Sequence, residues 1–151
     1  VDPDNRRPVD YKPRIAMLDD LRRRESEDRI ALIRELAADP QRDEMKLLVT
    51  YRALEFRRTH RDLFSRGDYI PLYARGACAS HVCAFARRLG ERWAVAVAPR
   101  WTSRVAEWGN TEILLPAEAP SEWSDCLTGL IPRSWRIADI LAEFPVALLG
   151  A

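Results

Sequence analysis

The densest group of polar side chains lies at the start of the chain. It reads Asp2-Pro3-Asp4-Asn5-Arg6-Arg7-Pro8, so two carboxylates, an amide and two guanidinium groups stand between prolines that restrict the backbone. Charge-assisted hydrogen bonds from such groups could orient the hydroxyls of a polyhydroxyl ligand. The same groups could instead pair with one another and hold the shape of a structural loop. The residues alone leave both interpretations open.

Other combinations that could support catalysis are weaker. The sequence contains no nucleophile-elbow, phosphate-loop, dinucleotide-binding or zinc-protease motif. Ser80 and His81 are adjacent, but neighbouring side chains on a strand point to opposite faces, so they form a poor nucleophile–base pair. Cys83 has no evident base nearby in sequence, and we interpret it as a buried, unreactive thiol.

The cysteines predict a reducing environment. Cys78, Cys83 and Cys126 are odd in number and widely spaced, whereas a disulfide framework needs an even and dense set. We therefore expect a cytoplasmic protein. No C-x-x-C pair occurs, and only His60 and His81 could add imidazole ligands, so we expect neither a metal nor another cofactor.

The five tryptophans all lie after residue 90 and could stack on sugar rings. In a domain of this size most tryptophans belong to the core. Trp101 and Trp108 are the best candidates for exposed stacking residues.

Composition excludes several classes of protein. The chain has 151 residues, of which 47% are hydrophobic and 31% charged, values typical of a globular protein rather than a disordered one. It has no apolar run of about 18 residues, so we expect no membrane span. The net charge of +1 gives no bulk electrostatic argument for a nucleic-acid partner.

The chain changes character near Gly67. Residues 1–66 contain 16 basic and 14 acidic side chains, and residues 67–151 contain 8 and 9. Before Gly67 the apolar residues recur with helical spacing, which predicts a loop over 1–14 and three helices. They span 15–24, then from an N-cap at Ser26 to Asp39-Pro40, then from Asp43 to just before Gly67.

The third predicted helix has an arginine face formed by Arg52, Arg57, Arg58 and Arg61. Such a face could bind phosphate. It could also be an ordinary solvated surface, and we favour that interpretation because Glu55 and Asp62 cancel much of the field.

After Gly67 the hydrophobic period shortens to two. This pattern predicts short strands over 68–74, 81–87, 93–98, 111–115, 125–130 and 146–149. Several short strands separated by Gly and Pro turns favour an antiparallel β-sandwich. The sequence therefore predicts an α+β chain with its boundary near Gly67.

Several segments of the chain resemble the C-terminal part of the maltooligosyltrehalose synthase family, within glycoside hydrolase family 13 and the α-amylase superfamily. The first and most specific is residues 1–11. The others, in the order found in that family, are 63–64, 67–72, 81–87, 99–100, Trp108 with Thr111, 127–129 and 144–149.

The resemblance implies a parent enzyme with a (β/α)8 barrel followed by a β-sandwich. Residues 1–66 would be the loop and helices that complete the barrel, and residues 67–151 would be the C-terminal sandwich. Members of the family convert the reducing-end α-1,4 linkage of a maltooligosaccharide into an α,α-1,1 linkage through a glycosyl-enzyme intermediate. This is an intramolecular transglucosylation, an isomerase reaction of trehalose biosynthesis.

The same resemblance implies that no catalytic residue lies in this chain, because the three carboxylates of the family would be upstream of Val1. It implies Asp4, Asn5 and Arg7 as contacts near the sugar site, and Arg6 as a partner of a barrel carboxylate. We therefore expect the chain alone to be inactive. We also expect it to self-associate, through an apolar face of residues 15–66 where the missing barrel portion belongs.

The alternative is a non-catalytic β-sandwich module, either structural or binding maltooligosaccharide. Of these two roles we favour the structural one.

Overall fold

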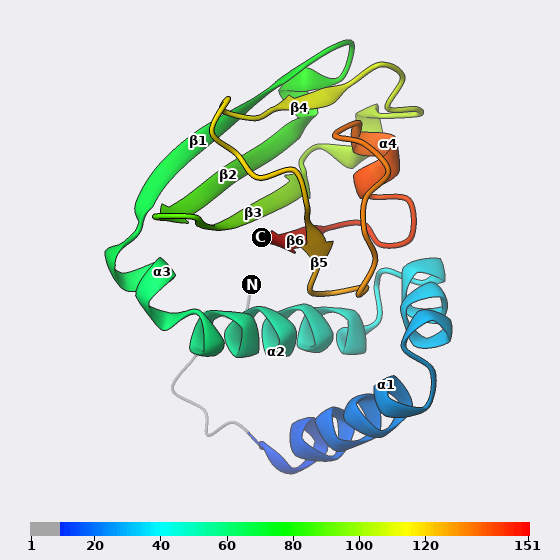
Figure 1. Cartoon of the computed structure of the whole chain (residues 1–151). Coiled ribbons are helices and arrows are strands. Elements are labelled where there is room, and N and C mark those ends of the chain that lie inside the picture. The colour runs from blue at the N-terminus through cyan, green and yellow to red at the C-terminus, as the bar shows by residue number, and fades with distance from the viewer. Residues whose placement is uncertain (1–9) are drawn as a thin grey trace. The chain divides into compact units, whose positions relative to one another are not determined.

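The computed structural model describes residues 10–151, which divide into two compact units, one on each side of the Leu48–Val49 bond (Figure 1). The change of pattern predicted at Gly67 is the change from helix to strand, since β1 begins at Asp68. The division into compact units comes earlier, within a helix.

The first unit contains one long kinked helix, α1, over Lys12–Ala38. It begins inside the segment predicted as a loop, because Pro13 occupies the first turn, where its missing N–H is no loss. The kink lies at Asp28, whose φ of −155° and ψ of 95° are not helical. The Asp28 carboxylate accepts a hydrogen bond from the Ala31 N–H at 3.0 Å, so Asp28 caps the second half.

The predicted N-cap at Ser26 is therefore wrong by two residues. The Ser26 hydroxyl instead donates to the Arg23 carbonyl at 2.6 Å, a bond to the preceding turn. The first unit buries Leu21, Leu32, Ile33 and Leu36 along α1. A network of ion pairs around Glu35 joins it to Arg24 and Arg42, and the hydrogen bond from Arg42 lowers the pKa of Glu35.

Two further helices precede the sheet. Helix α2 spans Asp43–Thr59 and crosses the boundary between the units, and α3 spans Arg61–Arg66. Acidic residues in the first turn of α2 and arginines in its last turn complement the helix dipole.

The second unit is built on one antiparallel sheet of six strands, with the order β4-β1-β2-β3-β6-β5. The strands are β1 (Asp68–Arg75), β2 (Val82–Leu89), β3 (Arg92–Pro99), β4 (Glu112–Leu114), β5 (Ser124–Asp125) and β6 (Ala147–Gly150). The predicted turn between β2 and β3 is confirmed, with Gly90 at a φ of 61°. Figure 1 shows β1, β2 and β3 side by side as the long strands of this sheet.

The two packed sheets of a β-sandwich are not confirmed. Among residues 10–151 the strands form a single sheet, and the layer against it consists of helix α4 (Ile137–Ile140) and loops. The predicted strand over 125–130 shrinks to Ser124–Asp125, because the following residues fold into a turn around the Asp125 side chain. His81 lies in a 3-10 helix, η1 (Ala79–His81), rather than in β2.

The core lies on one face of the sheet. Trp93, Val95 and Val97 of β3 point into it and are at most 1% exposed. Ile137 and Ile140 of α4 pack against them in the same cluster. Trp123 and Trp135 cross edge to face at 5.2 Å and extend this layer.

Asp125 holds the end of the sheet together. Its carboxylate accepts hydrogen bonds from the N–H groups of Leu127, Thr128 and Leu148 and from the Thr128 hydroxyl, at 2.8–3.3 Å. The residue is only 5% exposed. Burial raises the pKa of Asp125, although the four hydrogen bonds act in the opposite direction.

No helix among residues 10–151 combines the length and the apolar character needed to cross a bilayer.

Replacing Asp125 by Asn should lower the free energy of unfolding by about 1–3 kcal/mol, because an amide cannot accept all four bonds. The loss should depend on pH. A raised pKa means that the folded protein binds the Asp125 proton more tightly than the unfolded chain does. The stability that the Asp125 carboxyl adds through this proton is therefore complete below about pH 4 and declines as the pH rises through the folded-state pKa. Urea denaturation between pH 3.5 and 7 should show the gap between wild type and Asp125→Asn narrowing.

The exposed carboxylate of Glu118 provides the control. Glu118→Gln should change the free energy of unfolding by less than about 0.5 kcal/mol. A gap for Asp125→Asn that widens with rising pH would contradict the assignment.

Candidate functional site

The residues that the sequence predicts as sugar contacts, Asp4, Asn5, Arg6 and Arg7, lie outside the residues that the structure describes. Their role stays a prediction.

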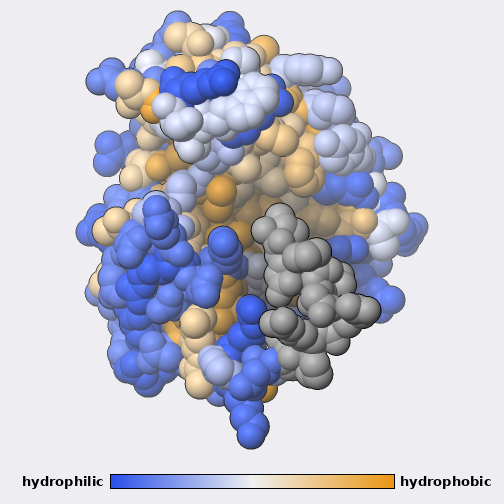
Figure 2. Space-filling view, turned by 180° about the vertical axis from the view of Figure 1, so that it is seen from behind, coloured by the Kyte–Doolittle hydropathy of each residue, from blue (hydrophilic) through white to orange (hydrophobic). Residues whose placement is uncertain are grey.

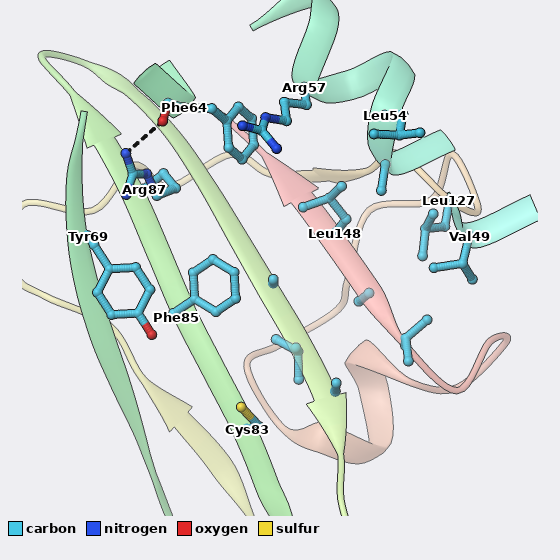
Figure 3. Close-up of a pocket in the computed structure, with 16 residues that line it drawn as sticks. Val49, Leu54, Arg57, Phe64, Tyr69, Cys83, Phe85, Arg87, Leu127 and Leu148 are labelled. Carbon is cyan, nitrogen blue, oxygen red and sulfur yellow. Dashed lines mark hydrogen bonds between the residues drawn. The ribbon is translucent and has the colours of Figure 1, made fainter. Parts of the chain in front are cut away.

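A hollow of about 590 Å³ lies between the α2–α3 helices and the sheet in the second unit. We call it the apolar hollow. Its walls come from Val49, Leu54 and Leu127 on one side and from Cys83, Phe85, Ala96, Ala98 and Leu148 on the sheet (Figure 3). Among residues 10–151, no Asp or Glu lines it. Figure 2 shows hydrophobic surface gathered in a hollow and bordered by hydrophilic side chains.

The hollow exists because β3 presents small side chains to it. Along β3, large side chains face the core, and Ala96 and Ala98 face the hollow. Alternate residues of a strand point to opposite faces, so one strand builds a filled core and an unfilled cavity. Beyond the hollow, Phe56 of α2 packs directly on β6, since a Cβ at Gly150 would lie 3.0 Å from its ring.

Arg87 holds the C-terminal end of α3 against the sheet. From β2 its Nη2 donates to the carbonyls of Phe64 at 2.9 Å and Gly67 at 2.7 Å, and Figure 3 shows the first of these bonds. These carbonyls belong to the last turn of α3 and to the residue after it, where a cation also complements the helix dipole. The Nε of Arg87 is buried and has no hydrogen-bond partner within residues 10–151.

A third contact lies near the middle of α2. Arg52 donates from Nε at 3.2 Å and from Nη2 at 2.9 Å to the Cys126 carbonyl. Arg52 thus differs from the rest of the predicted arginine face, because Arg57, Arg58 and Arg61 are exposed. Arg57 also lines the hollow, and its side chain lies beside Phe64 in Figure 3.

The open side of the hollow carries aromatic side chains. Tyr69 and Phe85, on neighbouring strands, stack with centroids 5.2 Å apart. Tyr69 remains 58% exposed. Cys83 lies two residues before Phe85 on the same face of β2 and is exposed, so the prediction of a buried thiol is wrong. It is exposed because the small residues beside it on β3 leave that face of the sheet uncovered.

The other candidate residues do not converge on a reactive arrangement. Ser80 and His81 lie in η1 and not at a nucleophile–base junction. The Cys78 thiol donates to the Glu107 carbonyl at 3.3 Å. Within residues 10–151 no group of three His, Cys, Asp or Glu side chains could hold a metal ion.

The tryptophans separate clearly by environment. Trp93 and Trp123 are buried, and Trp108 packs half-buried against the core, so the prediction of an exposed Trp108 is wrong. Trp101 is 57% exposed, as predicted. The helical spacing of the sequence could not predict the hollow. The alternation of Trp and Val with Ala over residues 93–98 could have indicated it, because it places large side chains on one face of a strand and small ones on the other.

Comparison with known proteins gives a consistent result. No family model matches the chain. The chain is 40% identical over 150 residues to a putative maltooligosyl trehalose synthase from each of two Mycobacterium tuberculosis strains, CDC 1551 / Oshkosh and H37Rv. This match covers 99% of the chain and 16% of each relative.

A solved structure agrees. A point mutant of maltooligosyltrehalose synthase from Arthrobacter ramosus is 36% identical, with a TM-score of 0.65, over 99% of this chain and 18% of that one. The resemblance seen in the sequence is confirmed. The chain spans about one sixth of the length of these relatives.

Gly67, at the junction between α3 and β1, has no room for a side chain. A Cβ at Gly67 would lie 2.4 Å from the Leu63 carbonyl oxygen and 2.7 Å from that of Arg88, and neither backbone atom can move easily. Gly67→Ala should therefore lower the free energy of unfolding by about 1–3 kcal/mol. Thermal denaturation followed by circular dichroism would measure it.

Gly90→Asn is the matched control. A Cβ at Gly90 meets nothing within 4 Å, and Asn tolerates its left-handed φ of 61°. It should cost less than about 1 kcal/mol. Equal losses for the two variants would contradict the steric argument.

Proposed function

We propose that this chain is the C-terminal portion of an enzyme that, like the maltooligosyltrehalose synthases it resembles, converts the reducing-end α-1,4 linkage of a maltooligosaccharide into an α,α-1,1 linkage. The similarity over 99% of the chain to one sixth of a much longer synthase supports this most directly. The proposal includes the (β/α)8 barrel of glycoside hydrolase family 13 and a cytoplasmic location.

In this proposal the bonds are made and broken outside the chain. Retaining glycoside chemistry needs two carboxyl groups about 5–5.5 Å apart on either side of the scissile bond. Residues 10–151 place no carboxyl group in the lining of the apolar hollow, so they offer neither a nucleophile nor an acid there. The role left to residues 10–151 is to support or position the catalytic portion.

The apolar hollow is the proposed contact with that portion. Its lining is mostly hydrophobic, it stands open on the Tyr69–Phe85 side, and Leu54 on its rim is 58% exposed. Monomeric proteins rarely leave such surface uncovered. A segment of the remaining synthase polypeptide that presents apolar side chains beside a carboxylate would fill the hollow and pair with Arg57.

Activity provides the first test. The 151-residue chain should not convert maltopentaose, because it lacks the proposed carboxylates. A longer chain, extended by the coding sequence upstream of Val1, should form a non-reducing product, measured as loss of reducing ends and by chromatography. Turnover by the short chain would overturn the proposal, as would an upstream sequence that encodes no barrel.

Self-association provides the second test. The isolated chain should form dimers or larger species at tens of micromolar and bind a hydrophobic dye, because residues 10–151 leave the hollow uncovered. Ala98→Glu places a charge on the half-exposed floor of the hollow and should reduce both signals several-fold.

Ser103→Glu adds the same charge at an exposed position outside the hollow and should change neither signal. Sedimentation velocity and dye fluorescence are the measurements. A clean monomer that binds no dye would show that the hollow needs no covering partner.

The second candidate function is a module that binds maltooligosaccharide without catalysis. The exposed ring of Trp101 favours it, since the other tryptophans pack in or against the core.

A further inference from the structure

Trp101 combines exposure with an unusual backbone. Its side chain is 57% exposed, and its φ of 52° and ψ of 44° lie in the left-handed region. Within residues 10–151 it is the one non-glycine residue with a positive φ. For an L-residue this conformation costs about 1–2 kcal/mol. A protein that needed only a turn here would be more stable with Gly or Asn.

Two neighbours fix the ring in place. The Arg100 guanidinium carbon lies 4.4 Å from the centroid of the Trp101 ring, a cation–π contact. The imidazole of His81 meets the ring edge on, with centroids 6.1 Å apart and planes at 84°. The ring is therefore held from one face and from one side while more than half of the residue surface meets solvent.

The neighbours are themselves anchored. Arg100 Nε donates to the Ser80 carbonyl at 2.7 Å, and the Arg100 N–H donates to the His81 carbonyl at 2.8 Å. These bonds join the start of β2 to the end of β3, next to the Val82–Pro99 pair of the sheet. Trp101 consequently stands on a rigid part of the fold, although it lies in a loop.

We propose that Trp101, Arg100 and His81 form a surface binding site for a glucose unit of an α-glucan chain. None of the three lines the apolar hollow. The choice of an α-glucan rests on the proposed function, and the existence of the aromatic platform does not.

The chemistry of the three residues fits a pyranose. One face of a glucose ring is formed by C–H groups and stacks on a flat apolar ring, while its hydroxyls lie at the rim. Arg100 covers one face of Trp101, so the sugar stacks on the other. His81 Nδ1 donates to the Arg100 carbonyl at 3.4 Å, which leaves its Nε2 to accept a hydrogen bond from a rim hydroxyl, and Arg100 contributes by holding the indole ring from the face opposite the sugar.

Rigidity makes such a small site effective. An aromatic ring that is already held loses little side-chain freedom when a ligand binds, and this reduces the entropic cost of association. The backbone strain at Trp101 is then the stability given up to keep the ring exposed.

The test measures binding of maltoheptaose to the 151-residue chain by isothermal titration calorimetry and by quenching of tryptophan fluorescence. Trp101→Gly removes the ring and also relieves the left-handed strain, so the fold should be retained, with a thermal midpoint equal to or above that of wild type. This variant should weaken binding at least tenfold. Trp101→Phe keeps a smaller ring and should recover part of the affinity.

Tyr73→Ala is the matched control, because Tyr73 is 73% exposed on β1 and, within residues 10–151, has neither a cation nor an imidazole against its ring. It should change affinity less than twofold. Equal binding by wild type and Trp101→Gly, or no binding by wild type, would overturn the site. So would preference for a single-stranded oligonucleotide, which also stacks on aromatic rings beside arginine.

The outcome is separable from that of the proposed function, which is read by turnover of the longer chain. A longer chain that is active, with a short chain that binds no glucan, would reject this site alone. Binding that depends on Trp101 without synthase activity in the longer chain would reject the proposed function alone.

Discussion

The second unit depends on the alternation of large and small side chains along β3. Trp93, Val95 and Val97 are buried in the core on one face of the sheet, while the small side chains of Ala96 and Ala98 leave space on the other face. Close packing over α4 provides the stability, since burying each large apolar side chain contributes about 1.5–3 kcal/mol. The thin face contributes little by itself. It therefore tolerates a hollow, and the helices above it need other means of attachment.

Those attachments are few and specific. Phe56 packs on Gly150, Arg87 binds two carbonyls at the end of α3, and Arg52 binds the Cys126 carbonyl. The two arginines use backbone acceptors, and the Phe56 ring packs against a glycine, so the sheet itself adds no apolar side chain at these points. Asp125, the residue before Cys126, also makes such a bond: its carboxylate accepts from the Leu148 N–H and holds β6 in register. The arrangement keeps an apolar surface open beside a firmly held frame.

The sequence predicted elements better than it predicted their packing. Helical spacing and Gly67 located the switch from helix to strand, and Gly90 located the central hairpin, because both signals are local. The sandwich was not confirmed, because a period of two shows only that a strand has two faces and not what covers them. Asp28 replaced Ser26 as the cap because the hydroxyl bonded to the preceding turn. Exposure of Cys83 depended on alanines of a neighbouring strand.

In the proposed function, residues 10–151 supply no carboxyl group to the hollow, and their part in a glycosyl transfer would be position and binding. Covering the hollow would fix position, because apolar burial is strong but does not recognise hydroxyl patterns. Trp101 would provide binding, because an exposed ring beside a hydrogen-bonding imidazole recognises a sugar but buries too little area to hold two polypeptides together. The two surfaces share no residue, and a substitution in one leaves the chemistry of the other intact. Their effects on a complete enzyme should therefore add, with the hollow governing assembly and Trp101 governing how long a glucan stays near it.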